Sequence, residues 1–98
     1  MNNTRRRAIK RVIPQLESLA EEYKGKLNDI QNEVESIQSE EQDALDNMPE
    51  SLMDSDRYSA IEEAAEHLNE AVSAFDEALG AVDDSVQQII SALEDASA

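Results

Sequence analysis

Apolar residues recur at alternating steps of four and three residues along both halves of the chain. The first series is Ile9, Ile13, Leu16, Ala20, Tyr23, Leu27, Ile30, Val34 and Ile37, and the second is Ile61, Ala65, Leu68, Val72, Phe75, Leu79, Val82, Val86, Ile89 and Leu93. An average spacing of 3.5 residues is typical of helices that wind around each other in a left-handed coiled coil. The pattern therefore predicts two long amphipathic helices, each with one apolar seam.

Signals at the ends of the two series place the helix boundaries. Pro49 disfavours helical geometry at the residue before it, and Asp54 or Ser55 is a suitable N-cap for a second helix. Thr4 is the expected cap of the first helix, while Pro14 lacks a backbone donor and predicts a kink or a division near it. We expect a first helix at about residues 5–47 with a kink near Pro14, a turn at 48–54 and a second helix at about 55–96.

The short turn predicts that the two helices fold back on each other. Centring the turn on Ser51 pairs every residue of the first seam with an apolar residue of the second, so that Ile30 faces Val72 and Tyr23 faces Leu79. The expected fold is all-α: residues 1–98 form a single domain, an antiparallel two-helix coiled-coil hairpin.

Small residues beside the second seam suggest self-association. Ala64, Ala71 and Ala78 follow one another at seven-residue spacing, and small side chains let helices approach closely. The sequence therefore predicts a homodimer in which two hairpins form a four-helix bundle with these alanines in the interface. The alternative is that alanine is present only as a strong helix former on an exposed face.

Charge is strongly asymmetric along the chain. The sequence has 23 acidic and 8 basic residues, a net charge of −15, and Arg57 is the only base after residue 26. Such a surface repels nucleic acid and anionic membranes, so neither is expected as a direct partner. We expect the basic segment 5–11 to lie beside the end of the second helix, near Asp83, Asp84, Glu94 and Asp95, and contact with nucleic acid is its alternative role.

The residue types needed for catalysis or metal binding are scarce. There is no cysteine and one histidine, His67, which falls outside the predicted seam. Asp54 and Asp56 begin like a calcium loop, but Ser59 and Ala65 replace its glycine and its final glutamate. No apolar run approaches the roughly 18 residues that a membrane span needs. We expect no enzyme activity, cofactor or metal.

The acidic residues suggest a partner surface. Glu63, Glu70, Glu77 and Asp84 form one row along the second helix, and Glu62, Asn69, Asp76 and Asp83 form the neighbouring row. These rows predict an acidic band that either only solubilises the helix or binds a basic partner. Near the turn, Met48, Leu52, Met53 and Tyr58 are expected either to form a small separate core or to present an apolar knob. The candidate partner-binding residues are Glu63, Glu70, Glu77, Asp84, Leu52, Met53, Asp54 and Asp56.

The segment from Glu40 to Leu52, EEQDALDNMPESL, resembles the turn of small acidic proteins encoded by phages and prophages. That group shares an E-E-Q-x-A-x-D-N-x-P-E-S-L turn, a basic start and Glu/Ala-rich heptads. The resemblance implies a virus-encoded accessory protein that acts in the cytoplasm of a bacterial host cell. Together with the absence of catalytic residue types, our interpretation is a non-enzymatic protein that binds another phage or host protein stoichiometrically. An alternative is an anti-defence inhibitor, of the anti-CRISPR or anti-restriction type, whose acidic surface mimics nucleic acid toward a basic nucleic-acid-binding enzyme.

Overall fold

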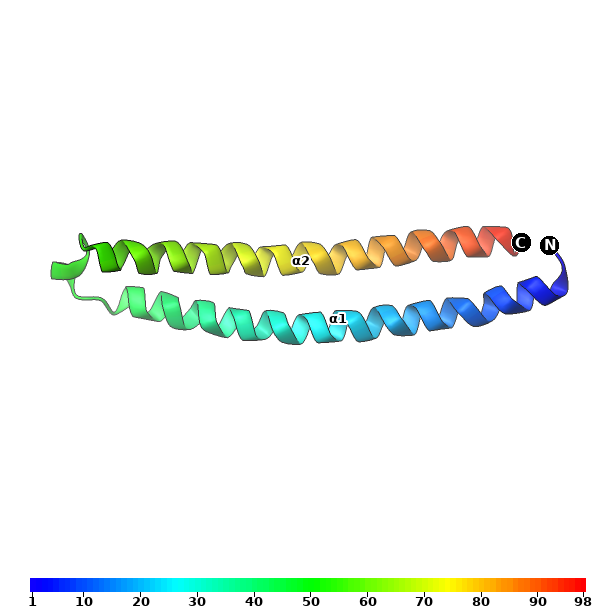
Figure 1. Cartoon of the computed structure of the whole chain (residues 1–98), viewed down its shortest axis with the longest axis horizontal. Coiled ribbons are helices and arrows are strands. Elements are labelled where there is room, and N and C mark those ends of the chain that lie inside the picture. Colours follow the sequence, from blue (N-terminus) through cyan, green and yellow to red (C-terminus); the bar gives the residue numbers. More distant parts are fainter. The chain divides into compact units, whose positions relative to one another are not determined.

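The computed structural model describes residues 1–98 and contains helices only (Figure 1). Helix α1 spans Asn3–Asp46, the short 3₁₀ helix η1 spans Glu50–Leu52, and helix α2 spans Asp56–Ala96. The all-α class predicted from the heptad pattern is confirmed. Neither long helix has a stretch that is apolar enough to cross a membrane.

Helix α1 begins earlier than the sequence predicts. The side-chain oxygen of Asn2 accepts the backbone N–H of Arg5 at 2.9 Å, so Asn2 is the N-cap and the assignment of Thr4 was wrong. Helix α1 runs through Pro14 without being divided. It has no acidic residue in its first turn and no basic residue in its last turn, so the charges near both ends oppose the helix dipole.

The turn shows the expected start of α2. The Ser55 hydroxyl accepts the backbone N–H of Tyr58 at 3.2 Å, which confirms Ser55 as a cap. Asp56 follows in the first turn, where a carboxylate is stabilised by the positive end of the helix dipole. Pro49 precedes η1, as expected for a residue that ends a helix.

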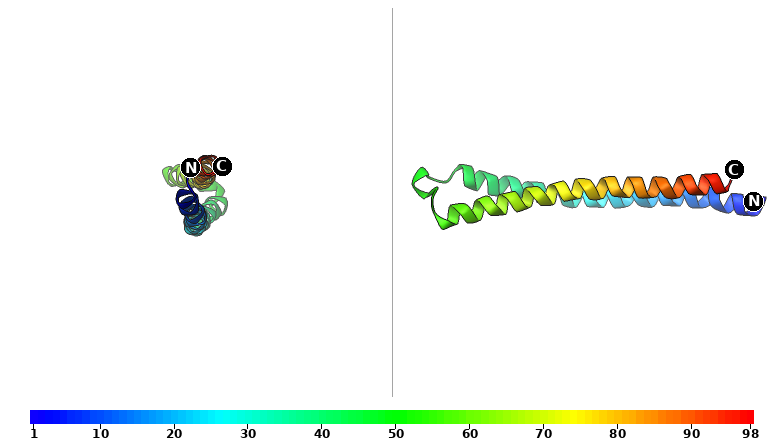
Figure 2. Two further views of the ribbon diagram at one scale, coloured as in Figure 1. Left: turned by 90° about the vertical axis from the view of Figure 1, so that its right-hand side faces the viewer. Right: turned by 90° about the horizontal axis from the view of Figure 1, so that it is seen from above.

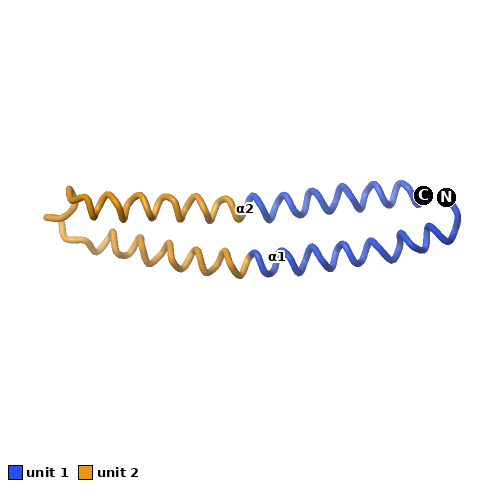
Figure 3. The backbone as a smooth tube through the Cα atoms, in the orientation of Figure 1, with its two compact units in different colours: residues 1–27, 77–98 blue, residues 28–76 orange.

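The chain forms two compact units, each built from one part of α1 and one part of α2 (Figure 3). Unit 1 contains residues 1–27 and 77–98, and unit 2 contains residues 28–76 with the turn. Within each unit the two helices lie side by side, and both chain termini lie at the same end of unit 1 (Figures 1 and 2). The helices are therefore antiparallel, as a helical hairpin requires.

The contact between the helices is narrow in both units. In unit 1, Ala20 and Ile90 are buried between half-buried neighbours: Ile9, Ile13, Leu16, Leu27, Leu79, Val82, Val86 and Leu93. In unit 2, Ala65 and Gln31 are buried, and the half-buried apolar residues include Val34, Leu45, Ile61, Leu68, Val72 and Phe75. No large side chain in the chain is fully buried.

Part of the predicted α1 seam was wrong. Tyr23, Ile30 and Ile37 are 49%, 50% and 51% exposed, and the next residues along the chain, Lys24, Gln31 and Gln38, are half-buried or buried instead. A straight helix drifts about 20° per heptad relative to a strict seven-residue repeat. Such a drift would expose the seam progressively, but the exposed fractions of Tyr23, Ile30 and Ile37 are nearly equal, so α1 is turned by about one position along this whole stretch and its contacts include the polar neighbours. The predicted α2 seam is confirmed except that Ile90 replaces Ile89.

The helix pair leaves an unusually large surface in contact with solvent. The chain exposes 7146 Å², whereas a compact protein of 10.9 kDa exposes about 5,600 Å² from the general scaling of area with mass. The solvent-accessible surface of the chain is thus about 1,500 Å² larger than that of a compact protein of the same mass. Two helices alone do not make a closed core here, so the surface is where function must be sought.

Candidate functional site

An ion pair between Lys24 and Asp83 joins the two helices along one side of unit 1. The Nζ atom of Lys24 lies 2.6 Å from Oδ1 of Asp83 on α2 and 2.9 Å from Oε1 of Glu21 on its own helix. The hydrogen bonds that Lys24 donates to Asp83 and to Glu21 raise its pKa above the ordinary value of 10.5. The lysine stem covers the seam while its ammonium group links the two helices.

Gln31 makes the corresponding contact in unit 2. Its side chain is 4% exposed, and Nε2 donates to the Val72 carbonyl at 3.1 Å and to Asp76 at 2.8 Å. Buried polar groups are stable when they are hydrogen-bonded, and this amide is held by α2 through both backbone and side chain. Asp76 and Asp83 are exposed, as the predicted acidic band requires, but each also accepts a hydrogen bond from α1, which the sequence did not predict.

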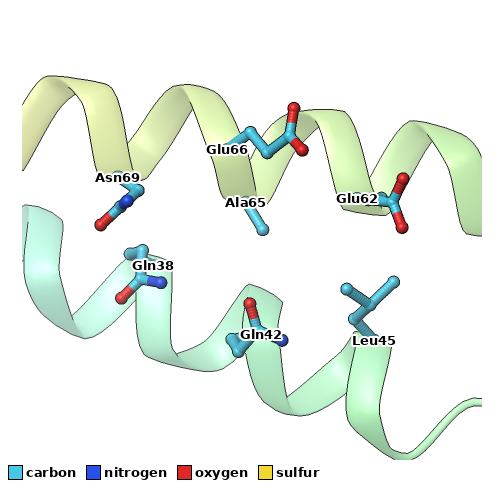
Figure 4. Close-up of a pocket in the computed structure, with 7 residues that line it drawn as sticks. All are labelled: Gln38, Gln42, Leu45, Glu62, Ala65, Glu66 and Asn69. Carbon is cyan, nitrogen blue, oxygen red and sulfur yellow. The ribbon is translucent and has the colours of Figure 1, made fainter.

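A shallow groove of about 300 Å³ lies farther along the same side of unit 2 (Figure 4). Gln38, Gln42 and Leu45 of α1 point toward α2, whereas the Glu66 carboxylate points away from α1 (Figure 4). The groove is completed by Glu62, Ala65 and Asn69 of α2. Amide and carboxylate groups make up most of its lining, so the polar residues beside the α2 seam face other polar groups.

The opposite side of unit 1 is apolar. A groove of about 310 Å³ is lined only by apolar and aromatic residues, namely Leu16, Leu19, Ala20, Tyr23, Val82 and Val86. Leu19 is 63% exposed at its edge, and Val12 and Ile89 are also exposed. Groups of exposed large apolar residues on a water-soluble helix mark sites where another molecule binds.

Unit 2 has a narrower apolar strip on α1. Ile30 and Ile37 are both about half exposed and lie two helical turns apart. Glu33 lies one turn from each of them, and Glu40 lies one turn beyond Ile37, so carboxylates accompany the strip. The combination suits a partner that carries both apolar and basic side chains.

The predicted partner-binding residues all lie on the surface. Glu63, Glu70, Glu77 and Asp84 are exposed, and so are Leu52, Met53, Asp54 and Asp56 near the turn. Among the acidic row, only Glu70 has a polar side-chain contact, with its Oε2 3.4 Å from Nδ1 of His67. Met48 and Tyr58 are half-buried, but Leu52 and Met53 are not, so the separate core expected at the turn is incomplete.

The predicted dimer residues are accessible to a further helix. Ala64, Ala71 and Ala78 are all half-buried in the single chain. Ala64 and Ala71 belong to unit 2 and Ala78 to unit 1. Their role in a four-helix bundle stays a prediction.

Ion pairs are distributed unequally between the units. Every lysine ion pair lies in unit 1, where Lys26 also contacts Glu22 at 3.2 Å, and no arginine forms one. The pairing expected between the basic segment 5–11 and Glu94 or Asp95 is therefore not formed. Unit 2 contains fifteen acids and one lysine or arginine, Arg57, and none of its carboxylates forms an ion pair with a lysine or arginine.

Sequence reasoning missed Lys24 and Gln31 as residues that join the helices. A signal was present: Lys24, Gln31 and Gln38 recur every seven residues, and Asp83, Asp76 and Asn69 recur at the same interval in the opposite direction. Matching polar rows on two antiparallel helices indicate a shared polar edge.

Neither helix brings together three or more potential metal ligands. Comparison of the chain with family models, curated proteins and solved structures finds no match. Its candidate sites are therefore interpreted from their own chemistry, which is that of exposed apolar and acidic side chains on two helices.

Proposed function

We propose that this chain is a non-enzymatic accessory protein of the phage type that acts by stoichiometric protein–protein binding through its helical hairpin. The observation that carries the proposal is the apolar strip of unit 2, where Ile30 and Ile37 stay half exposed although α1 is already paired with α2. The phage-type role and a bacterial cytoplasmic location are supported by the resemblance of residues 40–52 to the turn of phage-encoded proteins.

The chemistry around the strip defines the expected partner. An amphipathic helix that inserts apolar residues against Ile30 and Ile37 would meet Glu33 and Glu40 at its flank. Lysine or arginine beside the apolar residues of that helix would complement these carboxylates. The partner is thus a protein with a basic amphipathic helix.

The test uses the full chain with Ile30 and Ile37 both changed to serine. The matched control changes Ala44 and Ala60 to serine, because these residues are exposed in unit 2 but lie outside the apolar strip and outside unit 1. Tagged proteins are incubated with bacterial host lysate, and the mass of each purified complex is measured by light scattering. A one-to-one complex that is lost only in the Ile30/Ile37 variant supports the proposal, whereas a complex retained by that variant contradicts it.

A second candidate function is an anti-defence inhibitor whose acidic surface mimics nucleic acid. It is favoured by the exposed row Glu63, Glu70, Glu77 and Asp84, which has no lysine or arginine partner. Neighbouring members of the row are separated by about 10 Å of helical rise, so one row is sparser than the phosphates of DNA. Electrostatic mimicry therefore requires further acids from unit 2.

The discriminating variant replaces the three glutamates by glutamine and Asp84 by asparagine, which removes four charges and keeps the side-chain shapes. Mimicry predicts that a captured nucleic-acid-binding enzyme is released by this variant and by high salt, and that wild-type protein displaces labelled duplex DNA from it. A complex that resists both salt and the four substitutions favours binding through the apolar strip.

A further inference from the structure

A charge-free band crosses the apolar side of unit 1. On α1 it consists of Val12, Leu16, Leu19 and Tyr23, and on α2 of Ala78, Val82, Ser85, Ile89 and Ala92, each set at steps of three and four residues. Charged residues make up 32% of the chain, yet none occurs in either set. A surface that only contacts water does not require such a band, because acidic residues at these positions would also form a helix and would interact more favourably with water.

The two halves of this unit 1 band differ in size. The α1 half contributes large side chains, of which Leu19 and Tyr23 are strongly exposed, while the α2 half alternates the small Ala78, Ser85 and Ala92 with the larger Val82 and Ile89. Large residues on one helix pack well against small residues on another. We propose that a second copy of this chain covers the unit 1 band, with α1 of each copy lying over α2 of the other.

A two-fold axis makes the two halves complementary. When the axis runs along the helices, the large half of one copy meets the small half of its partner, and the same contact forms twice. The result is a four-helix bundle confined to unit 1. This self-association goes beyond the proposed function, because it uses a different surface from Ile30 and Ile37.

Charge favours unit 1 as the part that meets its own copy. Unit 1 contains seven bases and eight acids, a net charge of −1, whereas unit 2 contains one base and fifteen acids, a net charge of −14. Two copies of unit 1 can approach with little Coulombic cost, while two copies of unit 2 repel each other. The apolar groove and the neutral charge thus occur in the same unit.

The exposed area is sufficient for a stable dimer. A specific interface typically buries about 800 Å² from each partner. The chain exposes about 1,500 Å² more than a compact protein of its mass, by the scaling relation used above. Covering the unit 1 band would remove much of this excess and bury Leu19, Tyr23 and Ile89, the largest exposed groups around it.

The test measures the mass of the intact chain by analytical ultracentrifugation over a range of concentrations. Wild type should have twice the mass of 10.9 kDa. Leu19→Glu should weaken the dimer by about 30-fold or more, as expected when a charge replaces a central apolar anchor. Ile30→Glu is the matched control, because it makes the same kind of change at a half-exposed residue of α1 in unit 2, and it should leave the dimer intact.

A second variant tests the small half of the band without touching the seam. Ser85 is exposed in the single chain, so Ser85→Glu should preserve helix content by circular dichroism and still dissociate the dimer. A monomeric wild type, or a dimer that survives both Leu19→Glu and Ser85→Glu, would overturn the proposal. These results do not depend on capture of a foreign protein, so failure here and failure of the proposed function are separate outcomes.

Cysteine crosslinking tests the orientation. Lys24 lies level with Asp83, so on these antiparallel helices Leu19 lies level with residue 88, next to Ile89 of the band. In a mixture of Leu19→Cys and Ile89→Cys chains, a disulfide between the two different chains is expected. Crosslinking only between two Leu19→Cys chains would overturn the arrangement of α1 over α2.

Discussion

The rotation of α1 predicts opposite consequences for two neighbouring residues. Gln31 is buried and bonded to α2, whereas Ile30 is half exposed. Gln31→Ala removes one hydrogen bond to a backbone carbonyl, which contributes about 1 kcal/mol, and one to a carboxylate, which contributes about 1.5–3 kcal/mol. Because Asp76 is itself exposed, we use the lower part of that range and expect a loss of about 2–3 kcal/mol in the free energy of unfolding.

Ile30→Ala should cost less, although it removes more apolar atoms. It deletes three carbon groups worth about 0.8 kcal/mol each when fully buried, and half exposure reduces this to about 1 kcal/mol. The higher helix propensity of alanine offsets part of the remaining loss. Gln31→Ala is therefore expected to lower the free energy of unfolding more than Ile30→Ala does.

The assay is urea unfolding followed by circular dichroism, with Gln88→Ala as control. Gln88 is exposed on α2, and its substitution should change stability by less than about 0.5 kcal/mol. In thermal unfolding, the Gln31→Ala midpoint should fall by about 8–15 °C for a domain of this size. If Ile30→Ala proves more destabilising than Gln31→Ala, α1 faces α2 through the heptad seam instead and the reasoning is refuted.

Three further predictions concern stability and self-association. The hydrogen bonds of Lys24 raise its pKa, so the stabilisation from this group is complete below about pH 10.5 and is lost as the pH rises through the raised value. Lys24→Met should therefore reduce the decline in the free energy of unfolding at alkaline pH, and the control Lys26→Met should not. A Cβ atom at Gly25 or Gly80 would meet no atom within 4 Å, and neither glycine has positive φ. Gly25→Ala and Gly80→Ala should therefore each stabilise the helices by about 0.5–1 kcal/mol in the same urea assay. A variant that is less stable than wild type would indicate contacts at these positions. Ala71→Glu should leave the dimer mass unchanged in ultracentrifugation, because Ala71 lies in unit 2, whereas an interface through the predicted alanine row would be disrupted.

The helices and the turn could be predicted because local signals determine them. The apolar periodicity, Pro49 and the Ser55 cap each act within a few residues, and all agree with the observed α1, η1 and α2. The orientation of α1 is different, because turning the helix by one position replaces Ile30 by Gln31 in the contact and leaves the spacing of the apolar residues in the sequence unchanged. The heptad pattern alone could not show whether Ile30 or Gln31 faces α2.

The candidate sites were predictable to a similar extent. Exposure of Glu63, Glu70, Glu77 and Asp84 follows directly from their position opposite the seam. The engagement of Asp76 and Asp83 depends on the rotation of α1, which brings Gln31 and Lys24 beside them. The same rotation exposes Tyr23 and Ile37, so the apolar side could not be identified before the packing was known.

The charges at the ends of α1 bear on how the chain acquires its structure during synthesis. Helix α1 begins with arginines and ends with acids, so the charges at both of its ends interact unfavourably with its dipole, whereas α2 begins with Asp56, which interacts favourably. The ribosome makes α1 first, and at about 5–20 residues per second the rest of the chain follows within several seconds. During that interval the nascent α1 segment has no α2 to support it. We expect the α1 segment to become a stable helix only when α2 has emerged from the ribosome and can pack against it. The first half of the chain would then fold after the second half has been made.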